Sequence, residues 1–204
     1  MPNYLAFDTE TNGLPLFPDS TDMYDVLNWP RVYQIGAILV DEFGLELGRM
    51  NKIIKPNNWV ISTRSKFHAE LGITTEYLLD VGIPLHQAMD EFVALAEKAD
   101  EYIAHNAAFD RPVLTCEMFR SKRFPYHWTT KPQHCTKLMT EPILKLPGFK
   151  GKYKWPTLQE AYAFFNEGKS FEGAHDALAD VEATVQVFFQ AKDWIDSGME
   201  EFFG

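Results

Sequence analysis

The fold is decided by the stretch Tyr4-Leu5-Ala6-Phe7-Asp8-Thr9-Glu10, an apolar run that leads directly into two carboxylates. Side chains on a strand alternate between its two faces, so Asp8 and Glu10 point the same way and Thr9 points to the opposite face. Neighbouring carboxylates repel each other unless a cation lies between them, and hard oxygen ligands suit Mg²⁺ or Mn²⁺. Taken alone, the stretch fits an exposed acidic strand end equally well, so the decision depends on further ligands.

The length, hydrophobic fraction and net charge of the chain indicate one acidic domain. A length of 204 residues and a hydrophobic fraction of 46% allow a well-filled core, and we expect residues 1–204 to form a single domain. The net charge of −10 argues against a protein that coats nucleic acid through bulk electrostatics, because such binding needs clustered Lys and Arg. The negative charge is still compatible with an enzyme that binds one end of a nucleic acid strand, since bound divalent cations would offset local negative charge.

Cysteine usage and apolar runs bear on the cellular setting. Cys116 and Cys135 form neither a CxxC pair nor a zinc pattern, and Met1-Pro2-Asn3-Tyr4 does not read as a secretory leader. We therefore expect a reducing, cytoplasmic setting. No apolar run approaches the ~20 residues that span a bilayer, so no membrane association is expected.

The apolar pattern predicts an α/β domain. We expect strands at residues 4–10, 32–40, 45–54 and 101–105, and helices at residues 85–99, 107–120, 156–165 and 176–195. A proline-rich loop at residues 15–30 is expected to pack down locally through its aromatics, and residues 62–77 to be helical in pieces. A short apolar element is expected around residues 135–139.

A third acidic residue follows the predicted strand at 101–105. Asp110 ends the segment Ala104-His105-Asn106-Ala107-Ala108-Phe109-Asp110, where a turn lifts the chain out of the sheet. A lone Asp in the first turn of a helix is more often a cap or a dipole partner. Asn106 competes for the role of capping or bracing the same turn.

A histidine and a fourth acid precede the last predicted helix. His175 and Asp180 are five residues apart, roughly 140° of rotation at ~3.6 residues per turn, so they would not share a helix face. They can converge if His175 lies on the preceding loop, which Gly173 permits. Asp176 is the natural N-cap of the helix, so we leave it out of the chemistry.

Together these sites resemble the three exonuclease motifs of the DnaQ-like family, in the DEDDh subclass with four acids and a histidine. The matching segments are Asp8 to Leu14, Ala104 to Asp110 and Ala174 to Asp180, and the resemblance covers the chain from Tyr4 to about Phe188. It implies a ribonuclease H-like three-layer fold, with a mixed five-stranded sheet flanked by helices.

The same resemblance implies a 3′→5′ exonuclease that hydrolyses single-stranded nucleic acid ends, DNA favoured, to nucleoside 5′-monophosphates. The acids Asp8, Glu10, Asp110 and Asp180 would hold two Mg²⁺ or Mn²⁺ ions, which stabilise the attacking and leaving oxygens. His175 would be the general base.

Three residues would contact substrate by this resemblance. The main-chain N–H of Thr9 would bind the 3′ hydroxyl, Leu14 would either wedge against the base or pack beneath its turn, and Asn106 would brace the second-motif turn. Many relatives carry a histidine before Gly-Ile, where this chain has Leu71-Gly72-Ile73. His68 either substitutes for it or is an ordinary surface residue.

The segment 145–155 holds four lysines and no acid, interleaved with Tyr153 and Trp155. It is either a strand-guiding surface, on which bases stack, or a solvated loop that Trp155 anchors to the core.

Two rival functions remain open. An exoribonuclease would use the same chemistry on RNA, and a non-catalytic ribonuclease H-like module would bind nucleic acid without cleaving it. The chain stops at Gly204 without a tail, which favours a free-standing nuclease over a replicase subunit. A polymerase or repair partner would then dock on the folded body.

Overall fold

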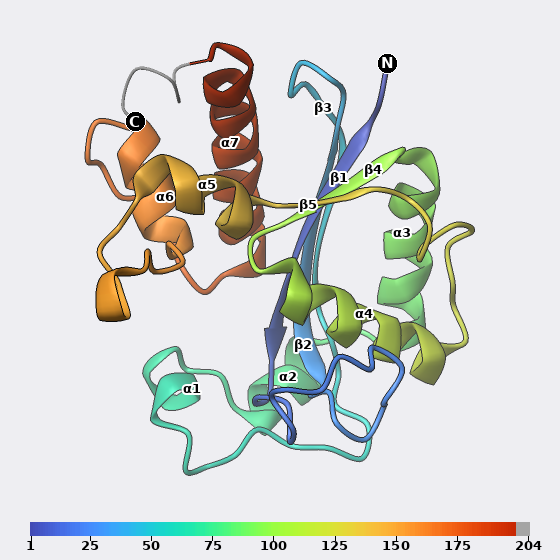
Figure 1. Cartoon of the computed structure of the whole chain (residues 1–204). Coiled ribbons are helices and arrows are strands. Elements are labelled where there is room, and N and C mark those ends of the chain that lie inside the picture. The colour runs from blue at the N-terminus through green and yellow to red at the C-terminus, as the bar shows by residue number, and fades with distance from the viewer. Residues whose placement is uncertain (199–204) are drawn as a thin grey trace.

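The computed structural model describes residues 1–198 (Figure 1). The end of the chain, on which the expectation about a missing tail rests, lies outside the described residues. The strands are β1 (Tyr4–Thr11), β2 (Val32–Val40), β3 (Glu46–Ile53), β4 (Glu101–Ala104) and β5 (Gln133–Cys135). The helices are α1 (Lys66–Glu70), α2 (Thr75–Val81), α3 (Leu85–Lys98), α4 (Ala107–Ser121), α5 (Thr136–Leu144), α6 (Leu158–Phe165) and α7 (Ala177–Asp196), with a 3₁₀ turn at Phe149–Gly151.

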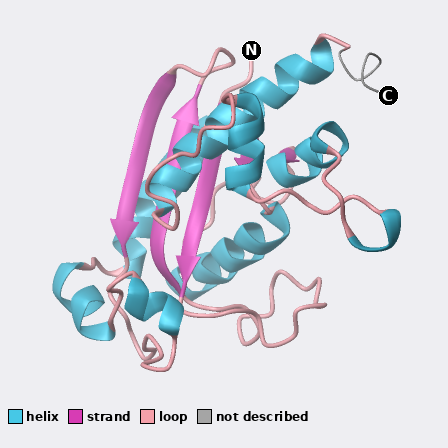
Figure 2. Cartoon of the chain, turned by 90° about the vertical axis from the view of Figure 1, so that its left-hand side faces the viewer, coloured by secondary structure: helices cyan, strands magenta, loops and turns pink. Residues whose placement is uncertain are grey.

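One sheet runs through the middle of the molecule in the order β3-β2-β1-β4-β5 (Figures 1 and 2). Strand β2 is antiparallel to β1 and β3, whereas β4 is parallel to β1 and β5 is parallel to β4. Helices α3 and α4 cover one face and α5, α6 and α7 lie on the other. The predicted three-layer architecture with a mixed five-stranded sheet is confirmed. No helix within residues 1–198 is long and apolar enough to cross a membrane.

The alternation of side chains along β1 sets the position of its polar end. Leu5 and Phe7 pack in the core beneath α3 and α4, whereas Tyr4 and Ala6 pack in the core beneath α7. Continued by the same alternation, the strand turns Asp8 and Glu10 toward the α7 layer and Thr9 toward α4. The carboxylates therefore leave the sheet where α7 begins.

Two expectations about local structure need correction. The apolar element around residues 135–139 is divided, because β5 ends at Cys135 and α5 begins at Thr136. Of the three aromatics in the loop at 15–30, Trp29 is buried and Tyr24 packs edge-on against Phe119 of α4, whereas Phe17 is exposed. The expected packing therefore holds for Trp29 and Tyr24 and fails for Phe17.

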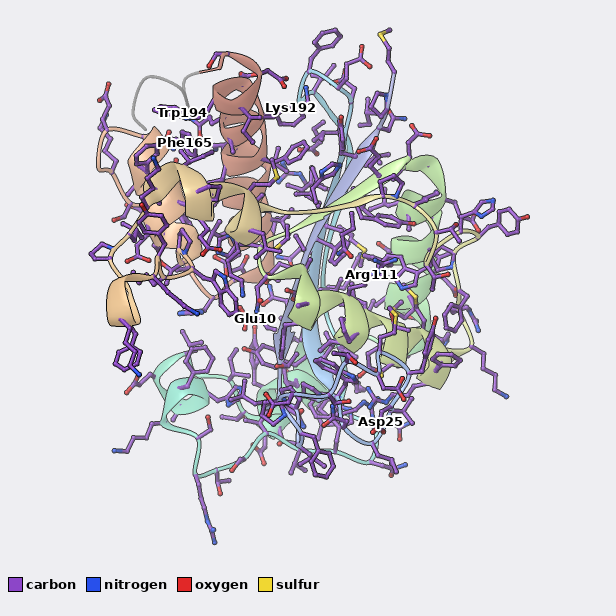
Figure 3. The ribbon with its side chains drawn as sticks, in the orientation of Figure 1. Glu10, Asp25, Arg111, Phe165, Lys192 and Trp194 are labelled. Atoms are coloured by element: carbon purple, nitrogen blue, oxygen red, sulfur yellow. The ribbon has the colours of Figure 1, made fainter. Side chains whose placement is uncertain are left out.

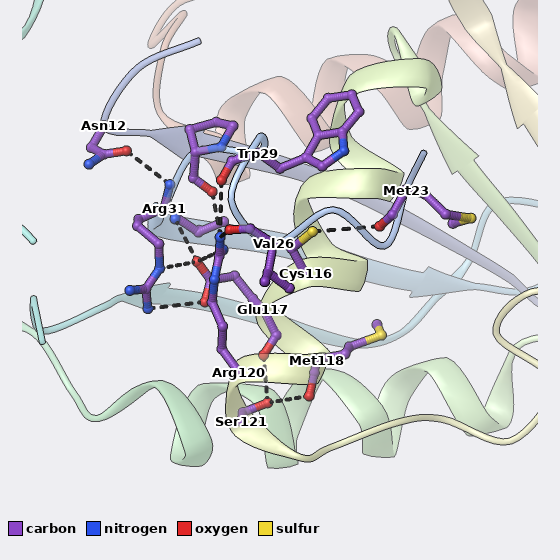
Figure 4. Close-up of polar contacts among 12 residues, drawn as sticks. Asn12, Met23, Val26, Trp29, Arg31, Cys116, Glu117, Met118, Arg120 and Ser121 are labelled. Atoms are coloured by element: carbon purple, nitrogen blue, oxygen red, sulfur yellow. Dashed lines mark hydrogen bonds and ion pairs between the residues drawn. The ribbon is translucent and has the colours of Figure 1, made fainter. Parts of the chain in front are cut away.

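The end of the loop is also held by a buried carboxylate on α4 (Figure 4). Glu117 is fully buried, and it accepts from Arg31 Nε at 2.8 Å, from Arg120 Nη1 at 2.9 Å and from the main-chain N–H of Val32 at 3.2 Å. Arg120 also donates to the main-chain oxygen of Trp29. A buried charge requires such partners, so this network fixes the end of the loop against α4.

A glycine in β2 allows α7 to approach the sheet closely. Gly36 pairs with Asp8 in the register of β1 and β2, and a Cβ at Gly36 would lie 2.5 Å from the main-chain carbon and oxygen of Ala177. Two positions earlier, Gln34 Nε2 donates to Asp176 Oδ2 at 2.7 Å. These contacts bring the first turn of α7 to the end of β1.

We predict that Gly36→Ala lowers the free energy of unfolding by about 1–3 kcal/mol, because the added methyl group meets main-chain atoms that cannot rotate away. Urea unfolding of the purified variant measures the change. The matched control is Gly48→Ala in β3, where a Cβ would meet only the end of the Leu95 side chain. Equal stability of the two variants would show that α7 does not depend on this close approach.

Candidate metal-dependent active site

The predicted catalytic residues gather where β1 ends, between the starts of α4 and α7. Figure 3 shows Glu10 at the end of β1, beside the first turn of α4. The acids come from three distant segments: Asp8 and Glu10 from β1, Asp110 from α4, and Asp180 from α7.

Asp110 is fastened to β1 by two hydrogen bonds. Its Oδ1 accepts from the Thr9 main-chain N–H at 3.1 Å and from the Thr9 hydroxyl at 2.7 Å, and the carboxyl group is buried. The pairing of β1 with β4 ends at Ala6–Ile103, so the N–H of Thr9 lies beyond β4 and is available to Asp110. The first and second motifs are thereby held together.

Asp180 and His175 converge in the way that the sequence required. His175 lies before α7 with a left-handed backbone (φ 70°), and its main-chain N–H donates to Asp180 Oδ2 at 3.2 Å. Asp176 caps the helix, as predicted, by accepting from the main-chain N–H groups of Leu178 and Ala179.

Three of the predicted residues form a tight group of potential ligands. Glu10, His175 and Asp180 each offer one atom, and these atoms all lie within 4.8 Å of one another. Asp8 and Asp110 lie outside that group, although both are close enough to perturb its charges.

The electrostatics show how crowded the acids are. Burial, followed by the charges of Asp110, Glu10 and Asp180, raises the pKa of Asp8 well above its ordinary value. Burial, followed by the charges of Asp180 and Asp110, raises the pKa of Glu10 to about 8, against a hydrogen bond from the Tyr33 hydroxyl that lowers it.

Burial is also the main cause for the other two acids. It raises the pKa of Asp110 to about 7, although the hydrogen bonds from Thr9 oppose the shift, and that of Asp180 to about 6. Clustered oxygen ligands whose ionised form is this unfavourable fit a hard divalent cation, which would relieve the repulsion.

Sequence reasoning missed residues that position the site. The ring of Phe67, on α1, packs edge-on against His175 with centroids 5.0 Å apart, and no local signal in the sequence indicated this contact. Gly36 did carry a signal, because an isolated glycine within a strand often marks a close backbone approach.

His68 is not the surface residue that was one of its two expected roles. It is buried, its Nε2 donates to the main-chain oxygen of Thr11 at 3.0 Å, and its Nδ1 lies 2.6 Å from Ser65 Oγ. The residue therefore fastens α1 to the end of β1. In this structure it is not a surface residue, and both its ring nitrogens are engaged.

The three residues predicted to contact substrate differ in how exposed they are and in whether their polar groups already have partners. Leu14 is 80% exposed, so it does not pack beneath its turn. Asn106 has a left-handed backbone (φ 72°) at the start of α4, and its side chain accepts from Lys137 instead of capping the helix. The N–H of Thr9 is engaged by Asp110. Their roles toward substrate remain predictions.

Comparison with known proteins adds a family and a fold. The model of the RNase_T exonuclease family matches residues 5–188. Escherichia coli exonuclease I in complex with a dT13 oligonucleotide superposes with a TM-score of 0.73 at 18% identity, over 100% of this chain and 44% of that chain. An exonuclease I from Methylocaldum szegediense gives 0.70 at 20% identity, over 95% and 41%.

These likenesses confirm the predicted ribonuclease H-like fold. The chain spans less than half the length of either solved structure. No curated protein sequence matches it.

We predict that the metal-free protein loses stability as the pH rises from about 4 to about 8. Glu10, Asp110 and Asp180 have folded-state pKa values above their ordinary ones, so the folded protein binds more protons than the unfolded chain in this range. Their contribution is fully present below about pH 4 and is lost as the pH passes about 8. Melting temperatures in EDTA between pH 5 and 8.5 measure the loss.

Added Mg²⁺ is expected to raise the melting temperature more at pH 8 than at pH 5, because the cation binds the ionised acids. Glu10→Gln should flatten the dependence on pH. The control Glu182→Gln removes an exposed acid of α7 that pairs with Arg49 of β3, and it should keep the slope. A slope that is the same for both variants would contradict this assignment.

Proposed function

Since this chain belongs to the RNase_T exonuclease family, whose model matches residues 5–188, we propose that it removes nucleotides from the 3′ end of single-stranded DNA. Family membership supports the predicted enzyme class, an exonuclease, and the 3′→5′ direction is part of the proposal. The observation that carries the finer proposal is the convergence of Glu10, His175 and Asp180 beside a buried Asp110. The dT13 and dA16 oligonucleotides bound by E. coli exonuclease I support single-stranded DNA as the substrate.

The acids Asp8, Glu10, Asp110 and Asp180 would hold two Mg²⁺ or Mn²⁺ ions. When bound, such ions stabilise the charge that develops on the oxygens of a phosphodiester undergoing hydrolysis. The Thr9 hydrogen bonds keep Asp110 at the end of β1 during this step. The exposed Leu14 is free to contact the terminal base.

His175 would accept the proton of the attacking water. Imidazole is the side chain best suited to exchange a proton near neutral pH. Water oxygen bonds to phosphorus, the bond from phosphorus to the 3′ oxygen of the preceding nucleotide breaks, and that oxygen takes a proton from solvent. The products are a nucleoside 5′-monophosphate and a strand shortened by one nucleotide.

The surroundings of His175 suit this role. Its position before α7 leaves the ring exposed, while Phe67 on one side and the bond from its main chain to Asp180 restrict its movement. The predicted role of the Thr9 N–H toward a 3′ hydroxyl would require that group to exchange its present partner, Asp110.

Exoribonuclease activity is the second candidate, because the same acids would hydrolyse RNA. A non-catalytic module is less well supported, since the five predicted catalytic residues lie close to one another where β1 ends. The cytoplasmic setting, and a polymerase or repair partner, remain predictions.

We expect the protein with Mg²⁺ or Mn²⁺ to shorten a 3′-labelled or 5′-labelled DNA strand faster than an RNA strand of the same sequence. The 2′ hydroxyl is the group on which the two substrates differ. Asp8→Asn should abolish hydrolysis of both, because it removes one charge from the proposed cation site without a change in size. Faster cleavage of RNA would contradict the assignment of DNA as the preferred substrate. A fully active Asp8→Asn variant would contradict the proposed role of Asp8 in metal-dependent hydrolysis.

His175→Ala is expected to lower kcat by about 10²–10⁴-fold, the usual contribution of a general base. His86→Ala is the matched control, because His86 is an exposed histidine at the start of α3. Equal activity of His175→Ala and wild type at pH 8 would assign His175 a packing role only.

A further inference from the structure

A groove of about 770 Å³ opens on the other side of the second-motif turn. The loop at 15–30 forms one wall, the start of α4 and β5 form the floor, and the start of α5 with Trp155 forms the other wall. Its lining includes Arg111, Gln133, Lys137 and Trp155.

The groove holds two cations that have no acidic partner within residues 1–198. Lys137 donates to Asn106 Oδ1 and lies 4.3 Å from the centre of the Trp155 ring. Arg111 donates to Gln133 Oε1 at 2.8 Å and to the main-chain oxygen of Trp128 at 3.1 Å, both neutral acceptors. In a chain of net charge −10, two adjacent unpaired cations point to an anionic ligand.

The floor of the groove also contains donors without acceptors. Arg111 Nε and Gln133 Nε2 are both buried and have no hydrogen-bond partner. Asp19, on the opposite wall, is the single carboxylate among the lining residues, so the groove remains cationic overall.

Trp155 offers an aromatic face to the groove. It is 60% exposed, which rules out the alternative that it anchors its loop to the core. The neighbouring Pro156 is fixed, because its main-chain oxygen accepts from His105 Nε2 at 3.2 Å while His105 Nδ1 accepts from the Thr136 hydroxyl at 2.9 Å. Burial lowers the pKa of His105 to about 4, so this ring is neutral and can bridge the two groups.

The groove and the candidate active site share one turn of chain. Consecutive residues on a helix are ~100° apart, so α4 directs Asp110 toward β1 and Arg111 toward the groove. Glu10 and Arg111 accordingly lie on either side of the first turn of α4 in Figure 3. A strand whose 3′ end lies among the acids can therefore continue into the groove.

We propose that this groove binds a nucleotide of the single strand upstream of the one being removed. Its base stacks on Trp155, and its phosphates lie against Lys137 and Arg111. The inference rests on the proposed function, because it assigns a second subsite to the same substrate. Stacking of bases on aromatic rings requires no sequence preference, which suits an enzyme that meets every base in turn.

The test is the affinity for a fluorescently labelled dT8 strand, measured in EDTA so that binding is separated from hydrolysis. Trp155→Ala should weaken binding by roughly 5- to 140-fold, since loss of one stacked base costs about 1–3 kcal/mol. Trp155→Phe should recover most of the affinity. Phe149→Ala, an exposed aromatic of the same segment outside the groove, should bind as wild type.

The charge of Lys137 is tested by salt. Lys137→Gln should reduce the slope of log affinity against log salt concentration by about 0.7, the value for one phosphate contact with a single strand. Wild-type affinity and an unchanged slope in the Trp155 and Lys137 variants would overturn the groove as a nucleotide subsite. Hydrolysis with Mg²⁺ is measured separately, so absence of cleavage would count against the proposed function alone.

Discussion

Repulsion among the acids at the end of β1 is the constraint on which the surrounding structure depends. Two like charges 4 Å apart at a partly screened site cost about 4 kcal/mol, so the fold must hold the acids against their own field. Asp110 is held by Thr9, Asp180 by the main chain of His175, and Glu10 by the Tyr33 hydroxyl at 3.4 Å. Each donor comes from a different part of the chain, which explains why the site needs the whole domain.

Local sequence was sufficient wherever one segment determines its own conformation. The first strand, the turn before Asp110 and the Asp176 cap were predictable from alternation, turn residues and capping preference. The convergence of His175 and Asp180 followed from helix geometry once His175 was placed before the helix. In all these cases the relevant neighbours lie within a few residues.

The contacts that sequence reasoning missed join distant segments. Gly36 matters because of Ala177, Phe67 because of His175, and His68 because of the main-chain oxygen of Thr11. A single sequence shows a glycine, a phenylalanine and a histidine, but it does not show which backbone or ring each will meet. The loop at 15–30 is a further case, since the buried Glu117 of α4, which nothing in the loop's own sequence indicated, holds its end through Arg31 and Arg120.

The long separation between the partners has a consequence for synthesis of the protein. Thr9 and Asp110 are 101 residues apart, and Gln34 and Asp176 are 142 residues apart. At a translation rate of about 5–20 residues per second, Asp180 follows Asp8 out of the ribosome by about 10–30 s. During that interval β1 and β2 lack the helix that covers Gly36. The nascent chain also lacks Asp180, the last of the four acids. The nascent chain therefore cannot assemble the proposed active site until it has folded through α7.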